Sequence, residues 1–146
     1  MRARIPVSLV ALVLIWAASM RVAGSAVAPA RQQAVTYLTE PTLIGSTIVQ
    51  GPVLFTHDET KMARGESCTT VYLVEPGKGP TEVIASFHCI PTRRTVVGKF
   101  TVTTRPNAAL GFGCVLTEYQ FAGDTEGHGV PISALVQVRA TGTGGT

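Results

Sequence analysis

The sequence predicts a small all-β protein, folded as an antiparallel sandwich or a partly open barrel with one short helix. Roughly seven or eight short segments are rich in β-branched and aromatic residues or alternate apolar with polar positions. The 15 glycines and 9 prolines fall largely between these segments. Only one stretch carries the signals of a helix. Short strands separated by turn residues are typical of β-sandwiches and small barrels.

The central pattern runs from Cys68 to Cys89 and predicts a β-hairpin around the loop at residues 76–80, Pro-Gly-Lys-Gly-Pro. If Val74 pairs with Val83, the same register pairs Cys68 with Cys89. This register also groups several residues on one face, which we expect to be buried: Tyr72, Val74, Val83, Ala85 and Phe87. Directly opposed residues have Cα atoms about 4.5 to 5.5 Å apart, which suits a disulfide. We therefore expect a Cys68–Cys89 disulfide, with Cys114 left as a free or intermolecular thiol.

The segments before this hairpin predict three short strands and the helix. The strands are expected at residues 34–39, 43–50 and 52–55. Thr56 and Glu59 have the spacing of a capping box, and Gly65 suits the left-handed position after a helix. The helix is therefore predicted at about residues 57–64.

The segments after the hairpin predict three further strands, at residues 95–104, 114–121 and 131–138. In the second of these, Val115, Tyr119 and Phe121 share one face. Residues 106–113 and the Gly-rich, acidic residues 122–129 are expected to be loops.

The first thirty residues have the layout of a secretory signal. Arg2 and Arg4 precede an apolar run at residues 5–20, and small residues follow. We expect residues 1–30 to be a signal peptide, residues 31–140 a single β domain and residues 141–146 a disordered tail. The predicted location is secreted or periplasmic. An uncleaved leader is the alternative, and it would anchor an outward-facing domain to the membrane.

The charge of the predicted domain does not favour a nucleic-acid partner. Three of the twelve basic residues precede residue 31, whereas all nine acidic residues follow it. Residues 31–146 are therefore neutral overall, and a phosphate-binding surface needs an excess of clustered basic residues.

The segment Gly123–Gly129 contains a candidate metal site, since Asp124, Glu126 and His128 alternate along it. Counted from Asp124, the glycine at the sixth position, Gly129, resembles that of a calcium loop, but Leu135 stands at the twelfth position, where the bidentate Glu should be. Carboxylate and imidazole ligands suit a transition metal better than calcium. The alternative interpretation is a polar connection between two strands.

Other cofactor signatures are incomplete. Zinc sites with several cysteines usually contain close pairs, whereas the three cysteines here are 21 and 25 residues apart. The C-x-x-C-H motif of covalent haem is absent from the sequence, although His57, His88, His128 or Met62 could hold a haem without it. A copper site needs a Cys, two His and usually a Met, and the stretch after Cys114 holds His128 but no Met.

The sequence contains no G-x-S-x-G elbow, no H-E-x-x-H motif and no phosphate-binding glycine loop. A catalytic Cys-His pair formed on folding by Cys114 with His57 or His128 is a further alternative. The sequence therefore predicts an exported β domain with a non-catalytic binding or structural role, such as an accessory subunit with a protein partner. No cofactor is required by this interpretation, and the oligomeric state stays open. The alternative is a metal- or haem-binding redox protein of the cell envelope that uses His57, His88, His128 and a free thiol.

Overall fold

The strands of this protein form one continuous sheet, in which most neighbouring strands are antiparallel. The computed structural model describes residues 30–131 and residue 133. The elements are β1 (Arg31–Ile44), β2 (Thr47–Asp58), α1 (Glu59–Ala63), β3 (Thr69–Glu75), β4 (Gly79–Phe87), β5 (Ile90–Arg93), β6 (Thr101–Pro106), β7 (Cys114–Gln120) and β8 (Glu126–Gly129). The sheet order is β4-β3-β2-β1-β7-β8-β5, and β6 pairs with β7 off this path.

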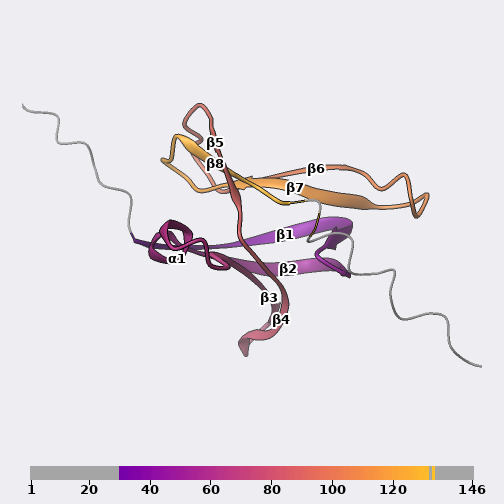
Figure 1. Cartoon of the computed structure of the whole chain (residues 1–146). Coiled ribbons are helices and arrows are strands. Elements are labelled where there is room, and N and C mark those ends of the chain that lie inside the picture. The colour runs from indigo at the N-terminus through magenta and orange to yellow at the C-terminus, as the bar shows by residue number, and fades with distance from the viewer. Residues whose placement is uncertain (1–29, 132, 134–146) are drawn as a thin grey trace, which may run out of the picture.

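The sheet curls into an open half-barrel (Figure 1). Strands β1 to β4 form one side, strands β5 to β8 form the other, and the segment between β4 and β5 crosses from one side to the other. The two sides join through a short parallel pairing of β1 with β7. The predicted all-β class is confirmed. Of the two predicted architectures, the partly open barrel describes this sheet better than the sandwich of two separate sheets.

The longest hairpin, β1 with β2, replaces the three short strands predicted before the helix. Gly45 at φ +61° makes the turn between them, so residues 43–50 are not one strand. Pro41 is accommodated by a break in register between Leu38 and Thr42. Inward positions of β2 alternate along the strand and include Val53, Phe55 and His57.

Helix α1 is shorter than predicted and begins two residues later. Thr56 and His57 remain in β2, so the predicted capping box does not form. Asp58 is the N-cap instead, and its carboxylate accepts hydrogen bonds from the amides of Thr60 and Lys61. Gly65 adopts φ +71° after the helix, as predicted.

The β3–β4 hairpin forms, but its register differs from the prediction. Tyr72 pairs with Val83, and Val71 pairs with Ala85, because two irregularities shift the ladder. The buried face of β3 consequently carries Thr69 and Val71, whereas Tyr72 is only half-buried. The alternation of residue types was similar on both faces, and the bulges decided which face turns inward.

The segments after β5 differ from the prediction in two places. Strand β6 begins at Thr101, six residues later than expected, and the predicted loop at 122–129 contains strand β8. Strand β7 matches the predicted bounds closely, but not the predicted face: Tyr119 and Phe121 belong to the core together with Leu116, whereas Val115 is buried outside the core cluster.

The core fills the concave side of the half-barrel. Its centre is aromatic: Phe55, Phe100, Tyr119 and Phe121 contact one another, with ring centroids 5.2 to 6.1 Å apart. No helix in the described part of the chain has the length and apolar character needed to cross a membrane. The predicted signal at 1–30 and tail at 141–146, and most of the predicted strand at 131–138, lie outside the described residues.

Candidate metal centre

Three side chains that can bind metal meet at the end of the core. One ring nitrogen of His57 and the sulfur atoms of Cys68 and Cys89 all lie within 4.8 Å of one another. The three residues are at most 3% exposed. A buried set of two thiols and an imidazole has the donor types that soft and borderline transition metals prefer.

Each of these residues is placed by a different part of the fold. His57 is the last buried position of β2, Cys68 directly precedes β3, and Cys89 lies between β4 and β5. Because β2, β3 and β4 are neighbours in the sheet, the ends of these strands lie together. The pairing of His57 with Thr69 in the β2–β3 ladder fixes Cys68 beside the imidazole.

The predicted Cys68–Cys89 disulfide is absent from the structure. The two sulfur atoms lie 3.1 Å apart, which exceeds the roughly 2.05 Å of a covalent bond, and both thiols are free. The shifted register explains the difference, because it places neither cysteine in the ladder. Instead, the amide of Cys89 donates a hydrogen bond to Cys68 Sγ over 3.2 Å.

The His57 ring is oriented by a carboxylate. Its Nε2 lies 3.0 Å from Glu59 Oε2, so it is the nitrogen that donates to the carboxylate. Its Nδ1 faces the cluster, 3.8 Å from Cys89 Sγ and 3.4 Å from the hydroxyl of Tyr119. A histidine ligand commonly donates its other N–H to a carboxylate, which fixes the tautomer and raises the basicity of the ligating nitrogen.

His128 and Met62 complete the surroundings of Cys89. His128 Nδ1 lies 3.5 Å from Cys89 Sγ, and Met62 Sδ lies 3.7 Å from the same atom. The His128 side chain is buried, and its Nε2 has no hydrogen-bond partner among the described residues. Burial, together with the nearby His57, lowers the pKa of His128 to about 4. The ring is therefore neutral at pH 7 and able to ligate.

The cluster favours metal binding over nucleophilic chemistry. Burial, with the neighbouring Cys68, raises the pKa of Cys89 to about 12, so the thiol is protonated at neutral pH. A bound cation would stabilise the thiolates and release their protons. Two thiolates at about 2.3 Å from a tetrahedral ion stand about 3.8 Å apart, so these sulfurs need to separate by only about 0.7 Å.

Acidic residues surround one approach to the cluster. A hollow of about 190 Å³ is lined by six residues: Gln32, Glu59, Asp124, Thr125, Glu126 and His128. Burial and the nearby Glu59 raise the pKa of Glu126. Three carboxylates at one opening favour cations at that opening.

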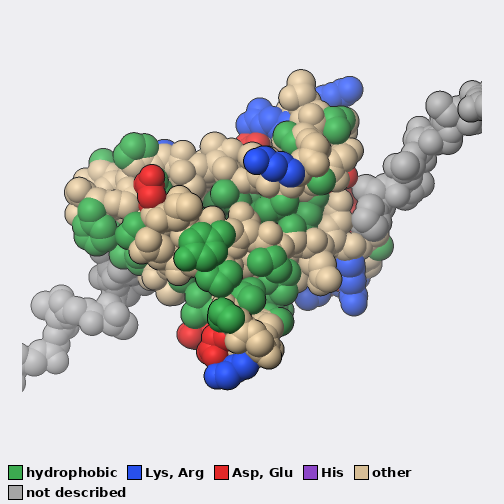
Figure 2. Space-filling model, turned by 180° about the vertical axis from the view of Figure 1, so that it is seen from behind, with side chains coloured by type: hydrophobic (Ala, Val, Ile, Leu, Met, Phe, Trp, Pro, Cys, Tyr) green, Lys and Arg blue, Asp and Glu red, His purple; other side chains and the backbone are tan. Residues whose placement is uncertain are grey.

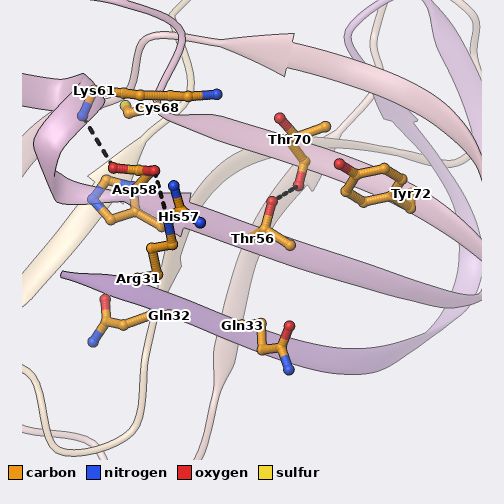
Figure 3. A pocket seen from close by; sticks show the side chains of 10 residues that line it. All are labelled: Arg31, Gln32, Gln33, Thr56, His57, Asp58, Lys61, Cys68, Thr70 and Tyr72. Atoms are coloured by element: carbon orange, nitrogen blue, oxygen red, sulfur yellow. Dashed lines mark hydrogen bonds and ion pairs between the residues drawn. The ribbon is translucent and has the colours of Figure 1, made fainter. Parts of the chain in front are cut away.

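A second hollow, of about 460 Å³, is lined by residues of β1, β2, α1 and β3 (Figure 3). His57 and Cys68 contribute to its wall. The Asp58 carboxylate lies between Arg31, which donates to it over 2.9 Å, and the backbone of Lys61. The Asp58 carboxylate therefore caps α1 and pairs with Arg31.

Of the ligands predicted from the sequence, some lie at the cluster and others do not. Of the acidic segment, only His128 contacts the thiol cluster, and Asp124 accepts a hydrogen bond from Gln32 over 2.7 Å. A metal held by Asp124, Glu126 and His128 stays a prediction. His88 is exposed, with its Nδ1 2.8 Å from the carbonyl of Glu66.

Cys114 lies far along the sheet from the other cysteines. It directly follows the 107–113 loop and donates a hydrogen bond to Glu40 over 3.2 Å. This contact raises the pKa of the Cys114 thiol. The combination of His57 with Cys68 and Cys89 was not predicted from the sequence. The inward alternation of His57 with Val53 and Phe55 was the signal that could have revealed it.

Comparisons with known proteins leave the geometry as the sole guide to function, since no family model, curated protein or solved structure matches this chain.

Proposed function

We propose that this protein is an exported β domain that binds one transition-metal ion, zinc or copper(I), at the buried cluster. The observation that carries the proposal is the convergence of His57, Cys68 and Cys89, whose donor atoms lie within 4.8 Å of one another. His128 supplies a fourth donor through its contact with Cys89. Two thiolates and two imidazoles are a common ligand set for zinc and are also suited to copper.

Export is part of this proposal and rests on the predicted signal at residues 1–30. The location is secreted or periplasmic, or the membrane surface if the leader is retained. In an oxidising compartment two adjacent free thiols are exposed to oxidation, and a bound metal protects them.

The test uses protein prepared without metal under reducing conditions. Native mass spectrometry after addition of one equivalent of zinc or copper(I) should show one bound ion. The Cys68→Ser, Cys89→Ser double variant should bind none, whereas Cys114→Ser should bind like the parent. A parent that binds neither ion contradicts the proposal.

A second measurement uses only the parent and so does not depend on how the double variant folds. At a urea concentration that exposes the two thiols of the metal-free protein, the bound metal should protect Cys68 and Cys89 from alkylation by iodoacetamide, and Cys114 should react equally with and without metal. Equal alkylation of all three cysteines in the metal-loaded protein would also contradict the proposal.

A protein partner is a second candidate function, supported by the outer face of the sheet. Cross-strand pairing aligns Val35, Leu54, Tyr72 and Val83 in one row. Tyr37 and Pro52 pair in the adjacent row, and Tyr37 is 67% exposed. Figure 2 shows hydrophobic side chains gathered over the sheet above a charged hairpin tip. A contiguous apolar area of this kind favours contact with an apolar face of another protein.

Photo-crosslinking in the native host tests this candidate. A photoreactive residue at Val35 and one at Val83 should capture the same protein, and one at the exposed Thr103 should not. Capture of no common protein at the first two positions would contradict it.

A further inference from the structure

Met62 stands among the ligand atoms of the cluster and not simply among aliphatic side chains. Its Sδ lies 3.7 Å from Cys89 Sγ. It is the only methionine in the described residues, since Met1 and Met20 lie outside them. Helix α1, which carries Met62, has five residues and buries none of them completely.

Cys89 Sγ is the common centre of the surrounding donors. Four sulfur or ring-nitrogen atoms of other described residues lie within 3.8 Å of it: Cys68 Sγ at 3.1 Å, His128 Nδ1 at 3.5 Å, Met62 Sδ at 3.7 Å and His57 Nδ1 at 3.8 Å. The set therefore contains a thioether in addition to the thiols and imidazoles. An ion that displaces the proton of Cys89 would have all four neighbours within reach of a small movement.

A thioether distinguishes between the two metals of the proposed function. Zinc in proteins is bound by Cys, His, Asp and Glu, and the two histidines and two cysteines already satisfy its four-coordinate preference. Copper(I) is a softer ion, and thiolate with thioether ligands select it. A methionine beside the ligating thiol therefore adds affinity for copper(I) without adding affinity for zinc.

Helix α1 borders both hollows beside the cluster. Lys61 lies on the wall of the hollow that includes His57 and Cys68, and Glu59 lies on the wall of the hollow that includes His128. The short helix is held by its Asp58 cap, by the contact of Glu59 with His57 and by Met62 packing against the core.

We infer that the resident ion is copper(I), and that Met62 is the ligand that sets this preference. The inference rests on the proposed metal-binding function and adds the identity of the ion. On binding, the thiols of Cys68 and Cys89 lose their protons to solvent, and copper stays monovalent throughout. No oxidant or reductant takes part in the step.

The test compares the parent with Met62→Leu, which keeps the apolar volume but removes the sulfur. Copper(I) affinity is measured by competition with the chromophoric chelator bicinchoninate, and zinc affinity by competition with a zinc-sensitive dye. Lys61→Gln, in the same helix, is the matched control. Met62→Leu should weaken copper(I) binding about tenfold or more and change zinc binding by less than about threefold.

The outcomes separate the two proposals. A parent that binds neither ion contradicts the metal-binding function itself. A parent that binds metal while Met62→Leu leaves its copper(I) affinity unchanged contradicts the copper inference alone. Equal weakening of both ions, or a loss in Lys61→Gln as large as that in Met62→Leu, would show that α1 merely covers the site, and would also contradict the role of Met62.

Discussion

Two regions of this protein offer metal ligands, and they are built in opposite ways. The segment Gly123–Gly129 holds three donor residues within five positions, whereas His57, Cys68 and Cys89 come from segments 11 and 21 residues apart. The second set is buried with its donor atoms within 4.8 Å of one another. In the first set, Asp124 is bonded to Gln32, and Glu126 Oε1 remains 3.8 Å from His128 Nδ1.

The difference shows that donors close in sequence do not converge when an extended strand carries them. Strand β8 begins at Glu126, so Asp124 belongs to the preceding turn and contacts β1. His128 faces the core and joins the other cluster. The acidic segment is thus better placed to line the opening of a site than to form one.

The largest expected effect is on thermal stability in the presence of metal. Free metal at 100 times the dissociation constant stabilises a folded protein by about 2.7 kcal/mol, which is roughly 10 °C or more in Tm for a domain of this size. We expect this rise in the parent and in an Asp124→Asn, Glu126→Gln variant, and its loss in Cys89→Ser. Differential scanning calorimetry measures all three. If only the Asp124→Asn, Glu126→Gln variant lost the metal-induced rise in Tm, the metal would bind at the acidic segment and not at the thiol cluster.

His128 belongs to both regions, and its substitution should have the second largest effect. His128→Gln removes one imidazole but keeps the two thiols and His57, so we expect metal affinity to fall by about 100-fold without being abolished. Chelator competition provides the dissociation constant. An unchanged constant would mean that three residues suffice and that His128 is only a core residue.

Glu59 tests the orientation of the His57 ring. Glu59→Gln weakens the acceptor of the His57 Nε2 hydrogen bond, and we expect metal affinity to fall about tenfold. The same chelator competition measures it. The exposed Glu66, which pairs with Arg64, is the matched control, and Glu66→Gln should leave the affinity unchanged.

The smallest effect is expected at Glu118, whose carboxylate is paired with Arg94. Arg94 donates two hydrogen bonds to it and lowers its pKa below the usual range. The stability that it contributes is present above the unfolded pKa of about 4.5 and is lost as the pH falls through the lower folded value. Glu118→Gln should therefore lower Tm by a few degrees at most at pH 7 and by less below pH 4.

Metal affinity should be the same in Glu118→Gln and the parent, because the paired carboxylate faces Arg94 and not the thiols. Parallel Tm curves for the two proteins across pH 3 to 7 would contradict the assigned role of this ion pair.

The sequence predicted the fold class better than the site because the two depend on different information. Alternation and turn residues are local, so the class and strand β7 were predictable from them. The cluster depends on which ends of β2, β3 and β4 lie together, and no local pattern encodes that. The register of Cys68 with Cys89 was wrong because bulges at Val71/Tyr72 and Leu73/Val74 leave no distinct signature in residue type.

The X-ray absorption spectrum of the copper(I)-loaded protein tests the central claim most directly, because it reports the atoms bound to the metal. We predict sulfur scatterers at about 2.3 Å with nitrogen scatterers near 2.0 Å, as expected for the thiols of Cys68 and Cys89 with imidazole. A first shell made only of nitrogen and oxygen would exclude Cys68 and Cys89 as ligands and would contradict the account.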